Sequence, residues 1–151
     1  MCRSSATRYP GPHEQIVVSN AAALLQSYPG TMNVDKDLLA TAIDEALTCS
    51  QTCRACADAC LSEEMIAELG TCVRTDLDCA DVCATTVKVL SRHTGYDANI
   101  TRAQLQAYIA ACRACGDECE KHAGMHEHCK VCAQACRACQ KACSALLASI
   151  A

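Results

Sequence analysis

Hydrophobic positions recur every three or four residues along most of the chain, which is the spacing of α-helices with one buried face. This pattern predicts a short helix over residues 14–28 and four longer helices after it. The longer helices are expected from an N-cap at Asp35 to about Leu61, from Ser62 to about His93, from Asp97 or Asn99 to about Ala123, and from Met125 to about Ile150. Thr101 to Gln104 fits a capping box near the third start.

Short connections join the long helices, so neighbouring helices should run antiparallel. The predicted fold is therefore all-α: an up-down-up-down four-helix bundle over residues 35–151. Residues 14–28 are expected to form a short extra N-terminal helix that packs outside the bundle. Residues 1–13, with Pro10-Gly11-Pro12, are expected to be a flexible tail.

Cysteine occupies the inward-facing stripe of the long helices. In CKVCAQACRACQKAC, residues 129–143, the gaps between cysteines are three, four, three and four residues, which is the spacing of the apolar seam in a bundle. Extending the seams through all four helices places fifteen of the 16 cysteines inward: Cys49, Cys53, Cys56, Cys60, Cys72, Cys79, Cys83, Cys112, Cys115, Cys119, Cys129, Cys132, Cys136, Cys139 and Cys143. Cys2 lies outside the pattern.

The thiols should gather at one end of the bundle, because the turns between the first and second and between the third and fourth long helices lie at the same end. The resulting column is about 20 Å deep, given a rise of about 1.5 Å per residue. Ordinary apolar packing is expected at the other end, from Leu38, Leu39, Ile43, Val87, Leu90, Leu105, Ile109, Leu146, Leu147 and Ile150.

Composition narrows the chemistry of this column. The N-terminus has no apolar signal segment and no run approaches the length of a membrane span, so the expected compartment is the cytoplasm. Clustered thiols in a reducing compartment more often bind metal than form disulfides. The net charge of −4 argues against a nucleic-acid partner. Fifteen seam thiols also exceed what filling a core with small residues explains.

Cu(I) fits the thiol array best. Fe–S ligand runs and the Glu-x-x-His signature of di-iron bundles are absent from the sequence, and zinc prefers closed groups of four ligands. Monovalent Cu(I), bound at roughly one ion per thiolate, neutralises buried thiolates. A core of this kind stores many ions and needs no catalytic role. A zinc- or cadmium-sequestering protein like metallothionein, and a thiol redox enzyme or sensor using one C-x-x-C pair, remain as alternatives.

Further candidate ligands lie near the mouth of the column. His122, His126 and Met125 fall at the last turn and Met65 near the first turn, where imidazole and thioether groups could pass ions inward. His128 belongs to the same entry cluster but is its weakest member, because it falls off the seam, and His13 and His93 are interpreted as surface residues. Asp76 stands on the seam between Cys72 and Cys79. It either hydrogen-bonds thiols or binds metal there, or a rotation of its helix exposes it.

The segments CSQTCRACADAC, CRACGDECEKH and CKVCAQACRACQKAC resemble the bacterial copper storage proteins, in particular their cytosolic members. The resemblance covers roughly residues 35–150. It implies a four-helix bundle that forms a homotetramer and holds many Cu(I) ions. A copper chaperone is a further candidate partner. Exported members have a methionine-rich entrance, whereas this chain offers mainly histidines.

Overall fold

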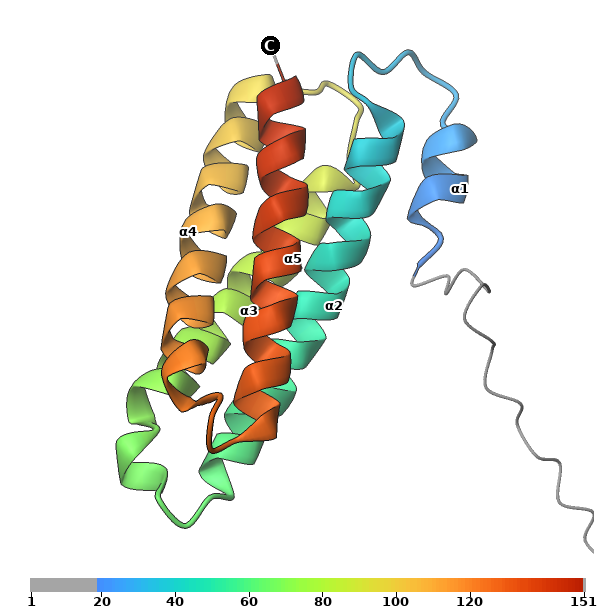
Figure 1. Cartoon of the computed structure of the whole chain (residues 1–151). Coiled ribbons are helices and arrows are strands. Elements are labelled where there is room, and N and C mark those ends of the chain that lie inside the picture. The colour runs from blue at the N-terminus through green and yellow to red at the C-terminus, as the bar shows by residue number, and fades with distance from the viewer. Residues whose placement is uncertain (1–18, 151) are drawn as a thin grey trace, which may run out of the picture.

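The computed structural model describes residues 19–150, which form an all-helical bundle (Figure 1). Its elements are α1 (Ala21–Gln26), α2 (Lys36–Leu61), the short 3-10 helix η1 (Ile66–Glu68), α3 (Gly70–Leu90), α4 (Ala98–His122) and α5 (Glu127–Ser149). The four long helices alternate in direction, and each packs against two neighbours: α2 and α4 both contact α3 and α5. The α2–α3 and α4–α5 connections lie at the same end. The predicted four-helix bundle is confirmed.

α2 and α4 begin at the same end of the bundle, and each has an aspartate N-cap. The Asp35 carboxylate accepts hydrogen bonds from the backbone N–H groups of Asp37 and Leu38, at 3.0 and 2.9 Å. Asp97 accepts one from Asn99 N–H at 2.8 Å, which decides between the two predicted starts of α4. Each cap satisfies N–H groups that have no partner within the helix.

The predicted capping box in α4 is wrong. Thr101 lies one turn inside the helix and is buried. The Gln104 side chain does not fold back to cap the helix but donates to Thr86 Oγ1 of α3 at 2.9 Å. The Gln104 side-chain amide, which the local pattern predicted to cap α4, instead makes a contact with α3.

The second long helix starts later than predicted. Ser62 ends α2, since its backbone N–H bonds back to Ala59 and Cys60 carbonyls, and α3 begins only at Gly70. Leu69, just before that start, is buried. The acidic residues after Ser62 suggested a helix start, but the chain forms the short helix η1 before α3 begins.

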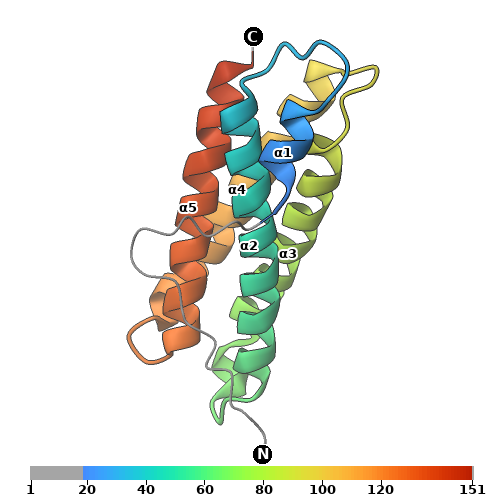
Figure 2. The ribbon, with the colours of Figure 1, turned by 90° about the vertical axis from the view of Figure 1, so that its right-hand side faces the viewer.

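The short N-terminal helix is also shorter than expected. Within the described residues α1 spans Ala21–Gln26 and packs on the outside of α2 (Figures 1 and 2). The predicted tail over 1–13, with His13, and the first part of the predicted helix lie outside the described residues. His93 is not a plain surface residue: its ring packs edge-on against Tyr28, with centroids 5.4 Å apart, and its Nε2 is buried.

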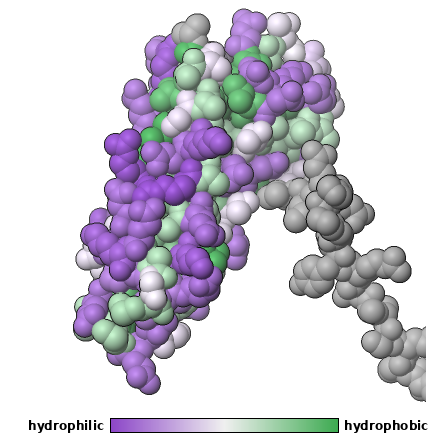
Figure 3. Space-filling model, viewed as in Figure 1, coloured by the Kyte–Doolittle hydropathy of each residue, from purple (hydrophilic) through white to green (hydrophobic). Residues whose placement is uncertain are grey.

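Two materials fill the interior of the bundle. At the end where α2 and α4 begin, the buried side chains are apolar: Leu39, Ile43, Leu90, Leu105 and Leu146. Further apolar side chains that are partly buried pack around them. From the middle to the other end the interior is sulfur. The face shown in Figure 3 is largely hydrophilic, with smaller apolar areas between. No helix in the described part of the chain is long and apolar enough to cross a membrane.

Candidate metal centre

All fifteen seam cysteines are buried and free, as the seam assignment predicted. α2 contributes four of them, α3 three, α4 three and α5 five. Their periodic spacing keeps each sulfur on the face that its helix turns toward the bundle axis. The seam pattern therefore becomes a continuous column of thiols.

Neighbouring sulfurs touch without bonding. Cys49 Sγ lies 3.7 Å from Cys53 Sγ, 3.9 Å from Cys79 Sγ and 3.8 Å from Cys136 Sγ. Closer to the mouth, Cys72 Sγ and Cys119 Sγ are 3.6 Å apart. A disulfide requires about 2.05 Å, so these are contacts between separate thiols. One soft ion placed among them would reach several sulfurs at once.

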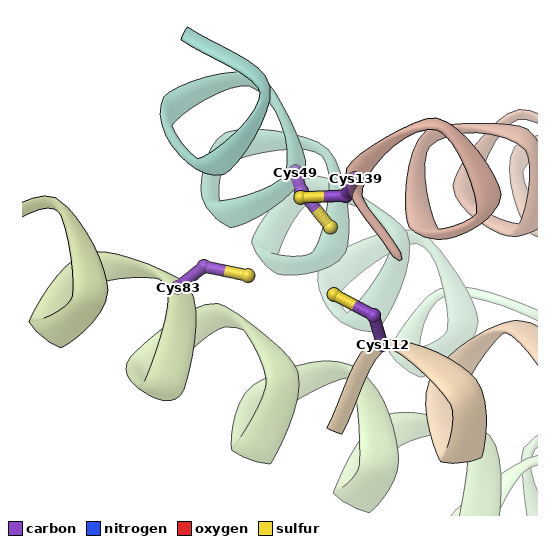
Figure 4. Close-up of side chains that lie close together, drawn as sticks. All are labelled: Cys49, Cys83, Cys112 and Cys139. Carbon is purple, nitrogen blue, oxygen red and sulfur yellow. The ribbon is translucent and has the colours of Figure 1, made fainter. Parts of the chain in front are cut away.

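The thiols form overlapping groups and not isolated sites. Figure 4 shows one such group, Cys49, Cys83, Cys112 and Cys139, with one sulfur from each long helix pointing toward a common centre. Its ligand atoms lie within 4.8 Å of one another. Cys49 also belongs to a second group with Cys53, Cys79 and Cys136, and two of these residues recur in a third. Shared members favour a connected cluster over separate closed tetrahedral sites.

Burial disfavours the thiolate form at both ends of the column. Burial raises the pKa of the Cys129 thiol near the mouth to about 11 and that of Cys143 at the deep end to about 12, because desolvation disfavours the thiolate and nearby acidic groups repel it. Across residues 19–150 no Lys or Arg side chain is buried. A set of thiolates in this interior therefore needs entering cations to balance its charge.

Asp76 faces the thiols and is fully buried, which excludes a rotation that exposes it. Its Oδ1 accepts hydrogen bonds from Cys115, Cys119 and Cys132, at 2.9, 3.2 and 3.3 Å. Desolvation, followed by repulsion from Cys132, raises the pKa of its carboxyl to about 7. The carboxylate also belongs to a group with Cys56, Cys72 and Cys119 that could hold an ion.

Imidazoles line the mouth where α2 ends and α5 begins. His128 Nδ1 lies 3.4 Å from Cys56 Sγ, 3.5 Å from Cys129 Sγ and 4.0 Å from Cys60 Sγ. On the other side of its ring, Nε2 is 3.0 Å from Glu63 Oε1. His126 Nδ1 reaches the same carboxylate oxygen at 2.9 Å. This part of the mouth therefore connects thiols to the surface through an imidazole.

The other residues that the sequence placed at the mouth are less engaged. His122 Nε2 lies 3.4 Å from Glu118 Oε1, and its side chain is largely buried. Met65 and Met125 are 47% and 66% exposed, so neither thioether belongs to the buried column.

Comparison with known proteins identifies the family. A family model described as copper storage protein matches residues 35–148, which is most of the chain. The chain belongs to the copper storage protein family. No match was found among curated proteins.

Solved structures of this family resemble the chain closely. The copper storage protein Ccsp from Streptomyces lividans, loaded with 10 copper equivalents, is 61% identical, with a TM-score of 0.84 over 85% of this chain and 98% of that one. A cytosolic copper storage protein from the same organism with five coppers is 65% identical, with a TM-score of 0.74 over 74% and 93%. Cu(I)-bound BsCsp3 is 34% identical, with a TM-score of 0.62 over 70% and 93%.

The sequence interpretation of this copper storage family member ranked His128 lowest among the entrance residues. Its position looked off the seam because it precedes Cys129. However, it lies four residues before Cys132, which is also a seam spacing. In the first turn of α5 both positions reach the interior, and the i,i+4 relation was the signal that could have identified it.

Tyr108 is a second residue that sequence reasoning left out of the column. It is fully buried on α4, and its hydroxyl is hydrogen-bonded to Cys139 Sγ at the deep end. Cys139 also contacts the Glu45 carbonyl oxygen, at 3.2 Å. The only signal in the sequence was the place of Tyr108 on the seam, four residues before Cys112, and that spacing does not distinguish an ordinary core aromatic from a partner of sulfur.

Proposed function

We propose that this member of the copper storage family stores Cu(I) on the fifteen inward cysteines as thiolates. The observation that carries the proposal is the column itself: sulfurs in mutual contact, overlapping in their groups, with Asp76 as the one charged side chain buried among the described residues. One Cu(I) per thiolate leaves such an interior neutral, whereas Zn²⁺ with four thiolates leaves two negative charges per site.

Burial of the thiols argues against a redox enzyme or sensor. A redox enzyme needs a thiol with a lowered pKa that substrate can reach. Here the cysteines of all four C-x-x-C pairs are buried in the bundle interior. We therefore assign no catalytic role to the chain.

Ions would enter at the mouth, where His122, His126 and His128 lie, with Met65 and Met125 as exposed thioethers nearby. Imidazole nitrogens bind Cu(I) less tightly than buried thiolates and so can pass it on. His128 is the strongest candidate, because its Nδ1 already contacts three thiols. Asp76 would provide an oxygen beside the first thiol groups below the mouth.

The family relationship supports the remaining assignments. A protein 65% identical to this chain is described as cytosolic, and we assign this chain to the cytoplasm as well. We also propose a homotetramer, which the resemblance to cytosolic copper storage proteins supports, and delivery of the ions by a copper chaperone.

Anaerobic titration of the reduced protein with Cu(I), in competition with a Cu(I) chelator, tests the proposal. We expect saturation on the order of fifteen ions per chain, about one per buried thiol. Saturation by about four Zn²⁺ with weak Cu(I) binding would identify a zinc store. A single reactive thiol with few bound ions would point to redox chemistry.

A further inference from the structure

Glu63 joins two elements that are distant in the sequence. It lies between α2 and η1, and its Oε1 accepts hydrogen bonds from His126, the N-cap residue of α5, and from His128 in the first turn of α5. The two imidazole rings lie with centroids 5.4 Å apart. All three side chains are partly buried, with exposed fractions of 34% for Glu63, 11% for His126 and 23% for His128.

The two imidazoles use different nitrogens to reach this oxygen. His126 presents Nδ1 and His128 presents Nε2. An ionised carboxylate has only lone pairs to offer, so the nitrogen that faces it must carry the hydrogen. In the neutral rings the lone pair is then on Nε2 of His126 and on Nδ1 of His128. Glu63 is 34% exposed to solvent and its Oε1 faces two imidazole nitrogens, an environment that suits the ionised carboxylate.

The lone pair of His128 is the one that matters for copper. Its Nδ1 faces Cys56, Cys60 and Cys129, the outermost thiol group of the column. If His128 carried its hydrogen on Nδ1 instead, a hydrogen atom would point at the sulfurs and no metal could bridge them to the ring. Histidines that bind metal commonly donate their other N–H to a carboxylate, which fixes the tautomer.

We propose that Glu63 is the positioning residue of the copper entrance: one carboxylate oxygen fixes opposite tautomers in His126 and His128 and so directs the His128 Nδ1 lone pair at the outermost thiols. This role rests on the proposed storage function. Glu63 itself is not a Cu(I) ligand, because carboxylate oxygen is a hard donor and Cu(I) prefers sulfur and nitrogen. Its effect is on the rate of uptake and not on the number of ions held.

The tautomers can be measured without any metal. Nitrogen-15 NMR of the histidine-labelled, copper-free protein distinguishes Nδ1–H from Nε2–H imidazoles. We expect the Nδ1–H form for His126 and the Nε2–H form for His128. In Glu63→Ala both should become mixtures, whereas Glu63→Gln, which keeps an acceptor oxygen, should retain both. His122 pairs with Glu118 and serves as an unchanged internal reference.

Stopped-flow uptake from a Cu(I)–chelator complex tests the consequence. We expect uptake by Glu63→Ala to be about tenfold slower, the lower end of what loss of such a partner does to metal binding. Glu63→Gln should stay close to the unaltered protein, and so should Glu64→Ala, a matched change at the neighbouring exposed residue. Equilibrium capacity should be equal in all four proteins.

Defined outcomes overturn the inference. Unchanged tautomers in Glu63→Ala, or equal uptake rates for Glu63→Ala and the unaltered protein, exclude the positioning role. Equal slowing in Glu63→Gln and Glu63→Ala shows that charge alone matters. A low equilibrium capacity for Cu(I) in the unaltered protein would refute the proposed storage function instead. The tautomer measurement uses copper-free protein and does not depend on that result.

Discussion

The two ends of the bundle share one helical geometry but contain different chemistry. At the end where α2 and α4 begin, the seam is filled by Leu39, Leu90, Leu105 and Leu146, all buried. Toward the other end the same seam positions carry cysteine, and the sulfurs touch at 3.6–3.9 Å. The apolar end gains stability from burial as any core does. The thiol end is also buried, but its fifteen thiols carry protons that a cation can displace.

Along the length of the bundle, the residues that stabilise the fold therefore lie apart from those proposed to bind copper. Aliphatic side chains can hold the helices together whether or not metal is present. The thiols are small, and Asp76 is a buried carboxyl, so the thiol end contributes less to stability until it is filled. Changes at the two ends should therefore affect different measurements.

Filling the column with Cu(I) should produce the largest effect. A ligand that binds only the folded state adds about 4 kcal/mol per site at a thousand times its Kd, less any binding to unfolded thiols. We expect the loaded protein to remain folded well above the melting temperature of the empty one, as followed by circular dichroism. Removing the metal with a chelator should restore the lower value. Equal melting temperatures would mean that copper does not stabilise the fold.

Leu146→Ala should destabilise the empty protein by about 2–5 kcal/mol, because it leaves a cavity at the apolar end. Urea unfolding of the empty protein measures this. Cu(I) capacity should stay the same, which serves as the control for the separation of the two ends. A fall in capacity together with stability would show that the ends are coupled.

Asp76→Asn should change how stability depends on pH. The folded pKa of Asp76, about 7, exceeds the ordinary value, so the folded state holds a proton that the unfolded chain releases. The stability linked to that proton is fully present below about pH 4 and is lost as the pH rises through 7. The variant should lack this loss and be more stable above pH 7, by up to about 4 kcal/mol, because the shift is roughly three pKa units at about 1.4 kcal/mol each. Urea unfolding of both proteins at several pH values measures this difference. Parallel plots of unfolding free energy against pH for the two proteins would contradict the prediction.

Cys136→Ala should have the smallest effect on stability, about 1 kcal/mol, because alanine removes only one buried sulfur atom. Its contacts with Cys49 and Cys53 place it in the middle of the column. The same chelator titration should show a loss on the order of one bound ion. Leu146→Ala provides the matched comparison, with the larger change in stability and no change in capacity.

The inward-facing positions of the long helices could be predicted because the α-helix has a regular period of about 3.6 residues. Spacings of three and four residues fix which side chains point inward, so the burial of all fifteen cysteines follows from their order in the chain. The aspartate caps followed from the same local logic. Periodicity also placed Asp76 inward, but only the packed helices excluded a rotation that would expose it.

Contacts between distant segments could not be predicted in this way. Glu63 meets His126 across 63 residues, and no repeat or spacing pairs them. α3 begins only at Gly70, after the short helix η1. These features lie at turns, where helical periodicity ends and tertiary packing decides the path of the chain.

Sulfur atoms 3.6–3.9 Å apart are already in van der Waals contact. Every ion that arrives must part its neighbours by turning cysteine side chains or easing helices away from one another, and native interiors resist such change. The turns beside the mouth can yield more readily than the leucine-filled far end. A filled bundle should therefore be slightly wider than an empty one, and widest near its opening.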